Sequence, residues 1–328
     1  MKRAFALLLV AAQCNVAHAY TLFGAETSDG RRVTLKWPQT PRYFVTSDAV
    51  GGVSAADFQA AIARGFARWE AVPTSTVTYQ FGGVTAARPG DDDGTSTLGF
   101  MNRPELDRVL ASTSFLVDDA TGALIESDIF FNAAFPWSVA AAGETGRFDL
   151  ESIATHEIGH FSGLGHSALG ETTSQNGGRQ VDSAESVMFP IAYTRGSIAG
   201  RTLKADDIAG ISDLYPAPDF AAATGSISGR VTNGGKPSFG AHVVAYDLAK
   251  GTMVAGFALT GQGDFAIAGL SPGPHLLRVE PLDDADLESF FDDPARVDLG
   301  FRVTFHDRII VVPRGGDSGT IVVAVTPK

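Results

Sequence analysis

The chain has 328 residues, of which 44% are hydrophobic and 19% are charged, an ordinary composition for a globular protein. A chain of this length can bury about two independent cores, so disorder is not expected as its main state. Its 25 basic and 37 acidic residues give a net charge of -12, which opposes binding to phosphate backbones and to anionic membranes. Nucleic acids are therefore not expected among its partners.

The first residues have the pattern of a secretory signal peptide. Lys2 and Arg3 precede the apolar run 4–12, and residues 17–19 have the small-x-small pattern that a signal peptidase accepts. A transmembrane anchor is the alternative, but the apolar run is well short of the roughly 20 residues that span a bilayer. We therefore predict a signal peptide over 1–19, a mature chain without a membrane anchor, and an extracellular or periplasmic location.

The rest of the chain changes character at one place. Cys14, the single cysteine, lies in the predicted signal, so the mature chain has no thiol. Residues 20–215 mix helical and strand patterns, and the Pro- and Ala-rich segment 216–224 is typical of a linker. Residues 225–328 carry short β-rich runs between Gly and Pro turns, which predict a β-sandwich. Two domains are therefore expected.

In the first region the predicted elements follow in order. Residues 55–69 carry Phe58, Ile62, Phe66 and Trp69 at helical spacing, which predicts an amphipathic helix. Strands are predicted over residues 76–81, 109–117 and 127–132. Asp149 is the predicted N-cap of the next helix, which contains the motif described below.

That helix carries a pattern of metal ligands. His156 and His160 are four residues apart, so their imidazoles emerge one turn apart on one face and can reach the same ion. Gly163 can end the helix and bring His166 back as a third ligand. Three protein ligands leave a fourth position open, which is typical of catalytic zinc, and Glu157 is placed to activate a zinc-bound water. Coincidental spacing is the alternative, and five fixed positions rarely coincide by chance.

This motif resembles that of the metzincin metallopeptidases, and among them the matrixin branch. Residues 156–166 fit the extended zinc signature, residues 186–190 resemble the Met-turn, and residues 203–215 resemble the closing helix of the matrixin catalytic domain. Residues 127–132 resemble the strand before the active-site helix. The resemblance covers about residues 40–215 and implies an α+β metzincin catalytic domain, with a twisted mixed sheet and an active-site helix.

The resemblance also implies roles for individual residues. It makes His156, His160 and His166 the zinc ligands, and Glu157 the general base and proton shuttle. Met188 would form the floor beneath the metal, and Tyr193 would line the primed-side pocket that binds substrate. Tyr193 departs from the family by lying five positions after Met188, where vertebrate matrixins usually have four. Residues 109–117 would be the edge strand that binds an extended peptide.

The resemblance has limits for metals. Outside the signal and the motif, the histidines lie in the β-rich tail, so the second, structural zinc of animal matrixins has no histidine ligands in the catalytic region. One catalytic zinc ion is therefore expected. Structural calcium is a further option, because the acidic segments 91–93 and 118–119 could contribute oxygens. A solvated acidic turn is the alternative interpretation of both segments.

The tail resembles a different family. Its strand and glycine-turn pattern over residues 225–281 is similar to a carboxypeptidase-regulatory-like sandwich of the transthyretin type. Because no catalytic pattern lies beyond residue 224, we expect residues 225–328 to be dispensable for peptide-bond chemistry and to tether the enzyme to a large substrate.

Together these features predict a secreted, monomeric zinc metalloendopeptidase that acts on protein or peptide substrates. The alternative is a surface or matrix adhesion protein, in which the sandwich binds the partner and the metallopeptidase fold is only a scaffold. The presence of Glu157 favours the enzyme, because a scaffold has no chemical need for a base beside three zinc ligands.

Overall fold

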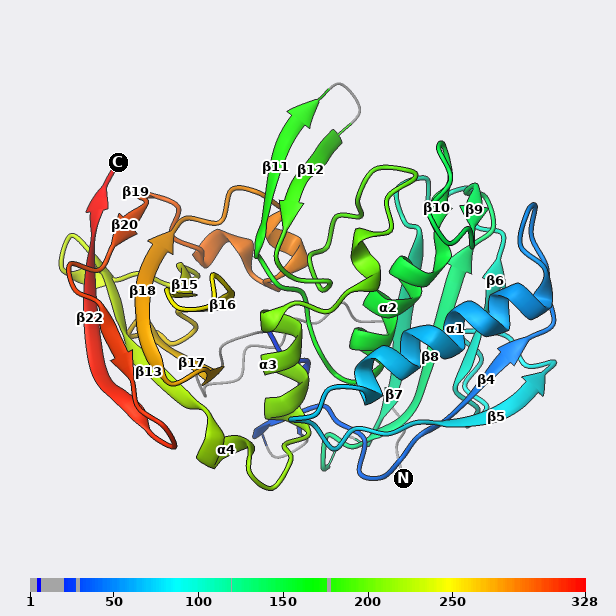
Figure 1. The fold of residues 1–328 in the computed structure, drawn as a ribbon, viewed down its shortest axis with the longest axis horizontal. Helices are drawn as coiled ribbons and strands as arrows, with labels where there is room; N and C mark the ends of the chain where they lie inside the picture. Colours follow the sequence, from blue (N-terminus) through cyan, green and yellow to red (C-terminus); the bar gives the residue numbers. More distant parts are fainter. Residues whose placement is uncertain (1–4, 7–20, 28–29, 119, 176–177) are drawn as a thin grey trace.

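The computed structural model describes residues 5–6, 21–27, 30–118, 120–175 and 178–328. The first region mixes strands and helices, and Figure 1 shows α1 and α2 side by side. Its elements are β1 (Phe5–Ala6), β2 (Gly24–Glu26), β3 (Arg32–Thr34), β4 (Arg42–Thr46), α1 (Ala55–Glu70), β5 (Gln80–Thr85), β6 (Thr97–Met101), β7 (Ala111–Val117), β8 (Leu124–Asn132), β9 (Trp137–Ser138), β10 (Phe148–Asp149), α2 (Leu150–Phe161), β11 (Gly170–Gln175), β12 (Gly178–Ala184), the 3-10 helix η1 (Ala199–Arg201) and α3 (Ala205–Leu214).

A six-stranded mixed sheet organises this region. Its strand order is β1-β7-β8-β6-β4-β5, in which β4 is parallel to β5 and β6, and β6 is parallel to β8. The strand β7 runs antiparallel to β8. Beyond β7 the two residues of β1 pair with Phe115 and Leu116, so the first half of β7 has a strand on one side only among the described residues. This half is the part of β7 that faces the candidate site.

The helix α1 matches its sequence pattern closely. Ser54 caps its N-terminus by accepting a hydrogen bond from the backbone N–H of Asp57. Phe58, Ile62 and Trp69, the apolar residues at helical spacing, are fully buried. The predicted strand at residues 76–81 is shifted, because the sheet pairing of β5 begins only at Gln80.

The C-terminal region is mostly β and contains two five-stranded sheets. One has the order β14-β13-β22-β19 with β17 beside β13, and the other has the order β16-β15-β18-β20 with β21 beside β18. The elements are α4 (Phe220–Ala223), β13 (Gly225–Asn233), β14 (Lys236–Pro237), β15 (His242–Asp247), β16 (Met253–Phe257), β17 (Asp264–Leu270), β18 (Gly273–Glu280), the 3-10 helices η2 (Leu287–Ser289) and η3 (Pro294–Arg296), β19 (Phe301–Arg302), β20 (Thr304–Phe305), β21 (Ile310–Val312) and β22 (Asp317–Pro327).

The two regions pack directly against each other. Figure 1 shows α3 between the helices of the first region and the C-terminal strands. The buried carboxylate of Asp206 on α3 accepts a hydrogen bond of 2.9 Å from the backbone N–H of Ala255 on β16. The segment predicted as a linker, 216–224, contains the short helix α4, whose Phe220 is buried. The two regions therefore stay in contact near this segment, although the composition of the chain changes there.

The predicted signal peptide lies outside the described residues, apart from the two residues of β1. No helix among the described residues is long and apolar enough to cross a membrane.

Candidate active site

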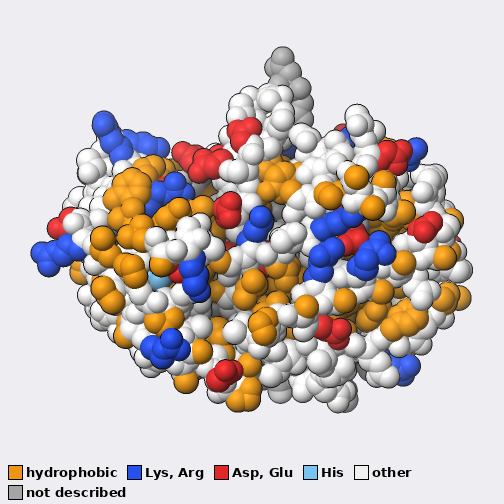
Figure 2. Space-filling view, in the orientation of Figure 1, with side chains coloured by type: hydrophobic (Ala, Val, Ile, Leu, Met, Phe, Trp, Pro, Cys, Tyr) orange, Lys and Arg blue, Asp and Glu red, His pale blue; other side chains and the backbone are white. Residues whose placement is uncertain are grey.

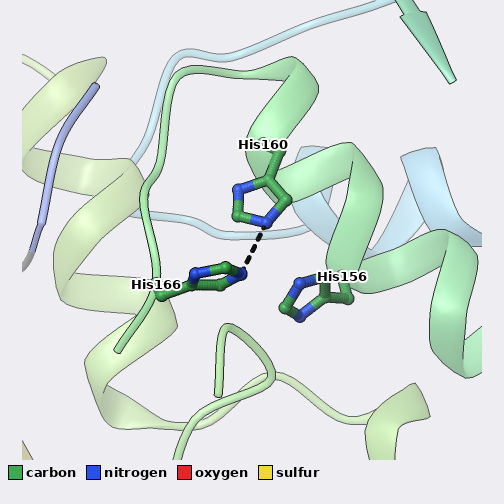
Figure 3. Close-up of side chains that lie close together, drawn as sticks. All are labelled: His156, His160 and His166. Atoms are coloured by element: carbon green, nitrogen blue, oxygen red, sulfur yellow. Dashed lines mark hydrogen bonds between the residues drawn. The ribbon is translucent and has the colours of Figure 1, made fainter. Parts of the chain in front are cut away.

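The three motif histidines converge on one point. The nitrogens that His156, His160 and His166 could offer to a metal all lie within 4.8 Å of one another, and Figure 3 shows the three rings facing a common centre. Among the described residues, these histidines form the group of three or more His, Cys, Asp or Glu side chains close enough to share an ion. The spacing in the sequence therefore predicted a real cluster.

Local backbone geometry explains how the cluster forms. The helix α2 begins at the N-cap Asp149, whose side chain accepts from the N–H of Ser152, and it presents His156 and His160 one turn apart. Gly163 follows with a φ of 107°, in the left-handed region that favours glycine. The chain turns back there, and it places His166 opposite the helix. The predicted role of Gly163 in ending the helix agrees with this geometry.

Each histidine donates through Nδ1 to a backbone carbonyl. The acceptors are the oxygens of Val187 at 2.7 Å from His156, of Leu164 at 2.8 Å from His160, and of Ser289 at 2.8 Å from His166, in that order along the motif. A neutral imidazole carries one proton, so these hydrogen bonds leave each Nε2 with a free lone pair. This is the tautomer in which Nε2 can bind a metal.

The spacing of the free nitrogens fits zinc. Nε2 of His160 and Nε2 of His166 lie 3.2 Å apart, the contact drawn as a dashed line in Figure 3. With both Nδ1 atoms donating, neither Nε2 carries a proton, so this contact brings two lone pairs together. Zinc held tetrahedrally at about 2.0–2.1 Å from each nitrogen separates two ligands by about 3.3 Å. The donor set and the spacing therefore suit a zinc ion.

Burial keeps the three imidazoles neutral. Desolvation lowers the pKa of His156 and lowers that of His160 well below its ordinary value. For His166, desolvation is the larger cause and repulsion from His156 in its protonated form is the second, and together they lower the pKa to about 3. A protonated imidazole cannot bind a metal, so burial preserves the metal-binding form across a wide pH range.

Glu157 lies beside the histidines without joining them. Its side chain is only 5% exposed, and its Oε2 accepts a hydrogen bond of 2.6 Å from the hydroxyl of Thr113 on β7. Burial raises the pKa of Glu157 to about 7, an effect that the hydrogen bond from Thr113 partly offsets. A carboxylate poised near neutral pH can accept and return a proton. The sequence analysis missed Thr113, since a threonine in a predicted strand gives no signal of this contact.

The predicted Met-turn, residues 186–190, packs against α2 through Met188. Met188 is buried, and a Cβ atom built on Gly159 would collide with its sulfur, so Gly159 allows the methionine to approach α2 closely. Asp207 on α3 fixes the turn by accepting hydrogen bonds from the hydroxyl of Ser186 and from the backbone N–H of Val187. Val187 in turn accepts the Nδ1 hydrogen bond of His156. Sequence reasoning located the turn but not its support by Asp207.

A cavity of about 740 Å³ opens in front of these groups. The first half of β7, the helix α2 and the residues after the Met-turn line it, together with Arg179 from β12 and Asp286 from the C-terminal region. Tyr193 also lies on its wall, where its hydroxyl exchanges hydrogen bonds of 3.0 and 3.1 Å with the backbone of Ala184. A role of Tyr193 in binding substrate stays a prediction.

The β11–β12 hairpin projects from the body of the molecule (Figure 1), and Gly178, Arg179 and Ala184 of β12 line the cavity. Figure 2 shows acidic side chains gathered beside the base of the hairpin. Burial raises the pKa values of Glu171 and Asp283, and the charge of Asp284 raises both further. The sequence analysis did not predict this hairpin.

Hydrogen bonds anchor the described parts of the acidic segments considered for calcium, and Asp119 lies outside the described residues. The carboxylate of Asp128 on β8 accepts a hydrogen bond of 2.7 Å from the backbone N–H of Gly90, which holds the loop before segment 91–93 against the sheet. In segment 118–119, Asp118 accepts hydrogen bonds from the backbone N–H groups of the turn that follows. Calcium binding stays a prediction.

Comparison with known proteins adds an independent line of argument. Residues 36–216 match the family model described as Matrixin, Peptidase M10. The chain is 26% identical to "Metalloendoproteinase 2-MMP" of Arabidopsis thaliana over 62% of its own length and 47% of that protein's. It is 41% identical to "Metalloendoproteinase 1" of Glycine max over 22% of its own length and 18% of that protein's. The chain thus spans about half or less of these curated relatives.

Solved structures give little further guidance. "The Bacillus anthracis TIE protein" aligns with 32% of this chain and 17% of that one, with 12% identity and a TM-score of 0.21. A likeness at this level carries no argument about fold or function.

Proposed function

The chain belongs to the matrixin family of metallopeptidases, and on this premise we propose that it is a secreted zinc-dependent endopeptidase that hydrolyses extended protein substrates. The observation that supports the proposal best is the position of Glu157, a buried carboxylate beside three metal-ready imidazoles at the wall of a cavity. The signal-peptide pattern over residues 1–19 supports secretion.

His156, His160 and His166 would hold the zinc ion through Nε2. Zinc at such a site supplies Lewis acidity, which polarises a carbonyl and makes water more acidic. Glu157 would take a proton from the attacking water and later return it to the leaving amine of the cleaved peptide. The hydroxyl of Thr113, 2.6 Å from Glu157, orients the carboxylate for both transfers. Met188 would support the site from below as a packed, polarizable side chain.

The strand β7 is the proposed platform for the substrate. Its first half lines the cavity, and among the described residues this half pairs with β8 alone. An extended peptide could add to the other side through main-chain hydrogen bonds, which place the scissile bond near Glu157. Because main-chain groups supply this binding, the proposed substrate class is extended polypeptide rather than one particular sequence.

Incubation of the mature protein with a diverse peptide library tests the proposal, with cleavage sites identified by mass spectrometry. We expect cleavage that stops when a chelator removes zinc and returns when zinc is added. Cleavage that persists in the metal-free protein would contradict the zinc mechanism. A protein that holds zinc and cleaves no peptide would instead favour the adhesion alternative.

A further inference from the structure

The third histidine of the cluster is held from the C-terminal region. His166 donates through Nδ1 to the backbone oxygen of Ser289, at 2.8 Å and across 123 residues of sequence. The other two histidines find their acceptors within the first region, at Val187 and Leu164. One of the three hydrogen bonds that set the metal-binding tautomer therefore depends on how the C-terminal region docks.

The position of Ser289 is fixed by its neighbour Phe290. This side chain is 1% exposed, and its ring contacts that of His166 with centroids 6.1 Å apart. On the other side it contacts Phe257 of β16 at 5.6 Å. Phe290 therefore links the ring of a zinc ligand to the core of a C-terminal sheet. The next residue, Phe291, is equally buried, but its ring contacts are to Phe239, Phe257 and Phe290.

A second set of contacts ties the same segment to the hairpin that follows His166. The backbone N–H of Thr172 on β11 donates to the carboxylate of Asp284 at 2.8 Å. The hydroxyl of Thr172 donates to the backbone oxygen of Asp284 at 2.7 Å. Arg179 on β12 lies 3.8 Å from the carboxylate of Asp286. The segment is thus also bound to the hairpin that follows His166 in the chain.

We propose that residues 284–290 of the C-terminal region are a positioning element of the zinc site. The carbonyl of Ser289 keeps the Nδ1 proton on His166, so that Nε2 stays free for the metal, and Phe290 keeps that carbonyl in place. The inference rests on the proposed zinc site and extends it. It replaces the expectation that residues 225–328 act only as a tether. Its consequence is reciprocal: if the docked segment strengthens zinc binding, bound zinc must strengthen the docking of the segment by the same factor.

Hydrogen exchange on the full mature chain tests the reciprocal effect without any substitution. Amide exchange is followed by mass spectrometry in the zinc-free and the zinc-loaded protein. We expect peptides that cover residues 284–291 to exchange about 10-fold more slowly with zinc, which lies within the roughly 5- to 150-fold range of typical coupling between two sites. Peptides from β22 serve as the control and should not change. Equal exchange of residues 284–291 in both forms would overturn the proposal.

A matched pair of variants tests the positioning role directly. Phe290→Leu and Phe291→Leu shrink neighbouring buried rings in the same cluster, but only Phe290 contacts His166. We expect Phe290→Leu to transfer its zinc to a chelator about 10- to 100-fold faster than the wild type, while Phe291→Leu stays close to it. In NMR spectra with ¹⁵N-labelled histidine, the signal of the Nδ1 proton of His166 should lose intensity in Phe290→Leu and not in Phe291→Leu. Identical behaviour of the two variants would overturn the proposal.

These measurements separate the inference from the proposed function. If the wild type binds no zinc or cleaves no peptide, the proposed function fails. If the wild type is a zinc peptidase but neither exchange nor zinc transfer responds as described, the positioning role alone fails. Should Phe290→Leu not fold, the exchange measurement on the wild type decides.

Discussion

Glu157 is the side chain on which the proposed chemistry depends most directly. Replacing it by Gln keeps the size of the side chain and an oxygen that can accept from Thr113, but it removes the ability to take a proton. We expect Glu157→Gln to lose about 10²- to 10⁴-fold in peptide turnover while it retains zinc. Turnover and zinc content should be measured on the same sample. Loss of zinc together with activity, or retention of both, would show that the assigned role is wrong.

Asp128 makes a prediction about stability and pH. Burial raises its pKa from 3.8 to about 7, an effect that hydrogen bonds from the N–H groups of Thr97 and Gly90 partly offset and that the charges of Glu126 and Asp93 increase. Between about pH 4 and 7 the folded chain therefore holds a proton that the unfolded chain has lost. The contribution of this group to stability is present at low pH, falls as the pH rises through that window, and is constant above it.

The substitution Asp128→Asn isolates this contribution. The amide is neutral at every pH, so the unfolding free energy of the wild type minus that of the variant should fall between about pH 4 and 7. The fall should be on the order of a few kcal/mol. Loss of one acceptor adds an offset that does not vary with pH. Urea unfolding at several pH values measures the difference. The control is Asp118→Asn at a carboxylate whose pKa is lowered, and it should show no such fall.

At the scale of elements, the helix α3 supports the zinc site through the Met-turn. Asp207 accepts hydrogen bonds from the backbone N–H groups of Val187 and Met188 and from that of Lys204, all buried or partly buried. Val187 then accepts from Nδ1 of His156 at 2.7 Å. A carboxylate at the start of α3 is thereby connected to the first zinc ligand.

Replacing Asp207 by Ala should affect both stability and metal binding. Each buried donor left without an acceptor costs about 1–3 kcal/mol, so we expect a clear loss in the unfolding free energy. Zinc should also leave faster, because the carbonyl of Val187 is no longer fixed. Denaturant unfolding and transfer of zinc to a chelator measure the two effects. Asp207→Asn keeps one acceptor oxygen and should recover part of both. Normal zinc retention in Asp207→Ala would contradict this connection.

The elements that could be predicted from sequence are those with local signals. The helix over 55–69 follows from its apolar spacing, and the motif helix follows from its apolar residues and its predicted N-cap Asp149. The structure has the two helices at Ala55–Glu70 and Leu150–Phe161. The hairpin of β11 and β12 was missed, because its strands are rich in Thr, Ser, Gln and Gly. Most of their side chains are exposed on both faces, so no alternation of apolar and polar residues marks them.

At the scale of the whole molecule, the sequence located the cluster of three histidines but not the groups that orient their rings. The acceptor for His166 is a backbone oxygen 123 residues away, and a backbone oxygen has no sequence signature. The contact of Thr113 with Glu157 spans 44 residues and was not predicted either, because strand pairing and packing decide which side chains meet. The change in composition at residues 216–224 was visible in the sequence. Composition describes the segment itself, however, and does not show that the regions before and after it pack against each other.

The contact between the two regions is extensive enough to make them depend on each other. A continuous cluster of buried hydrophobic side chains extends from the first region into both C-terminal sheets. Phe189, which follows Met188 in the predicted Met-turn, is 4% exposed and lies in a second cluster with Phe257 and Phe290. Ala209 on α3 packs closely against Gly269 of β17, and a Cβ atom added to Gly269 would lie 2.9 Å from the Cβ of Ala209. Removing the C-terminal region would expose all of these surfaces.

A chain that ends at Ala217 tests this dependence. Exposing one large apolar side chain costs about 1.5–3 kcal/mol, and the shortened chain would expose several while His166 loses its acceptor. We expect its melting temperature to fall by about 5–10 °C or more and its zinc to leave faster than from the full chain. Thermal unfolding with excess zinc, zinc transfer to a chelator and turnover of short peptides should be compared for the two lengths. The tether expectation predicts nearly unchanged turnover of short peptides. Unchanged stability and zinc retention in a shortened chain with that turnover would contradict the dependence of the two regions on each other.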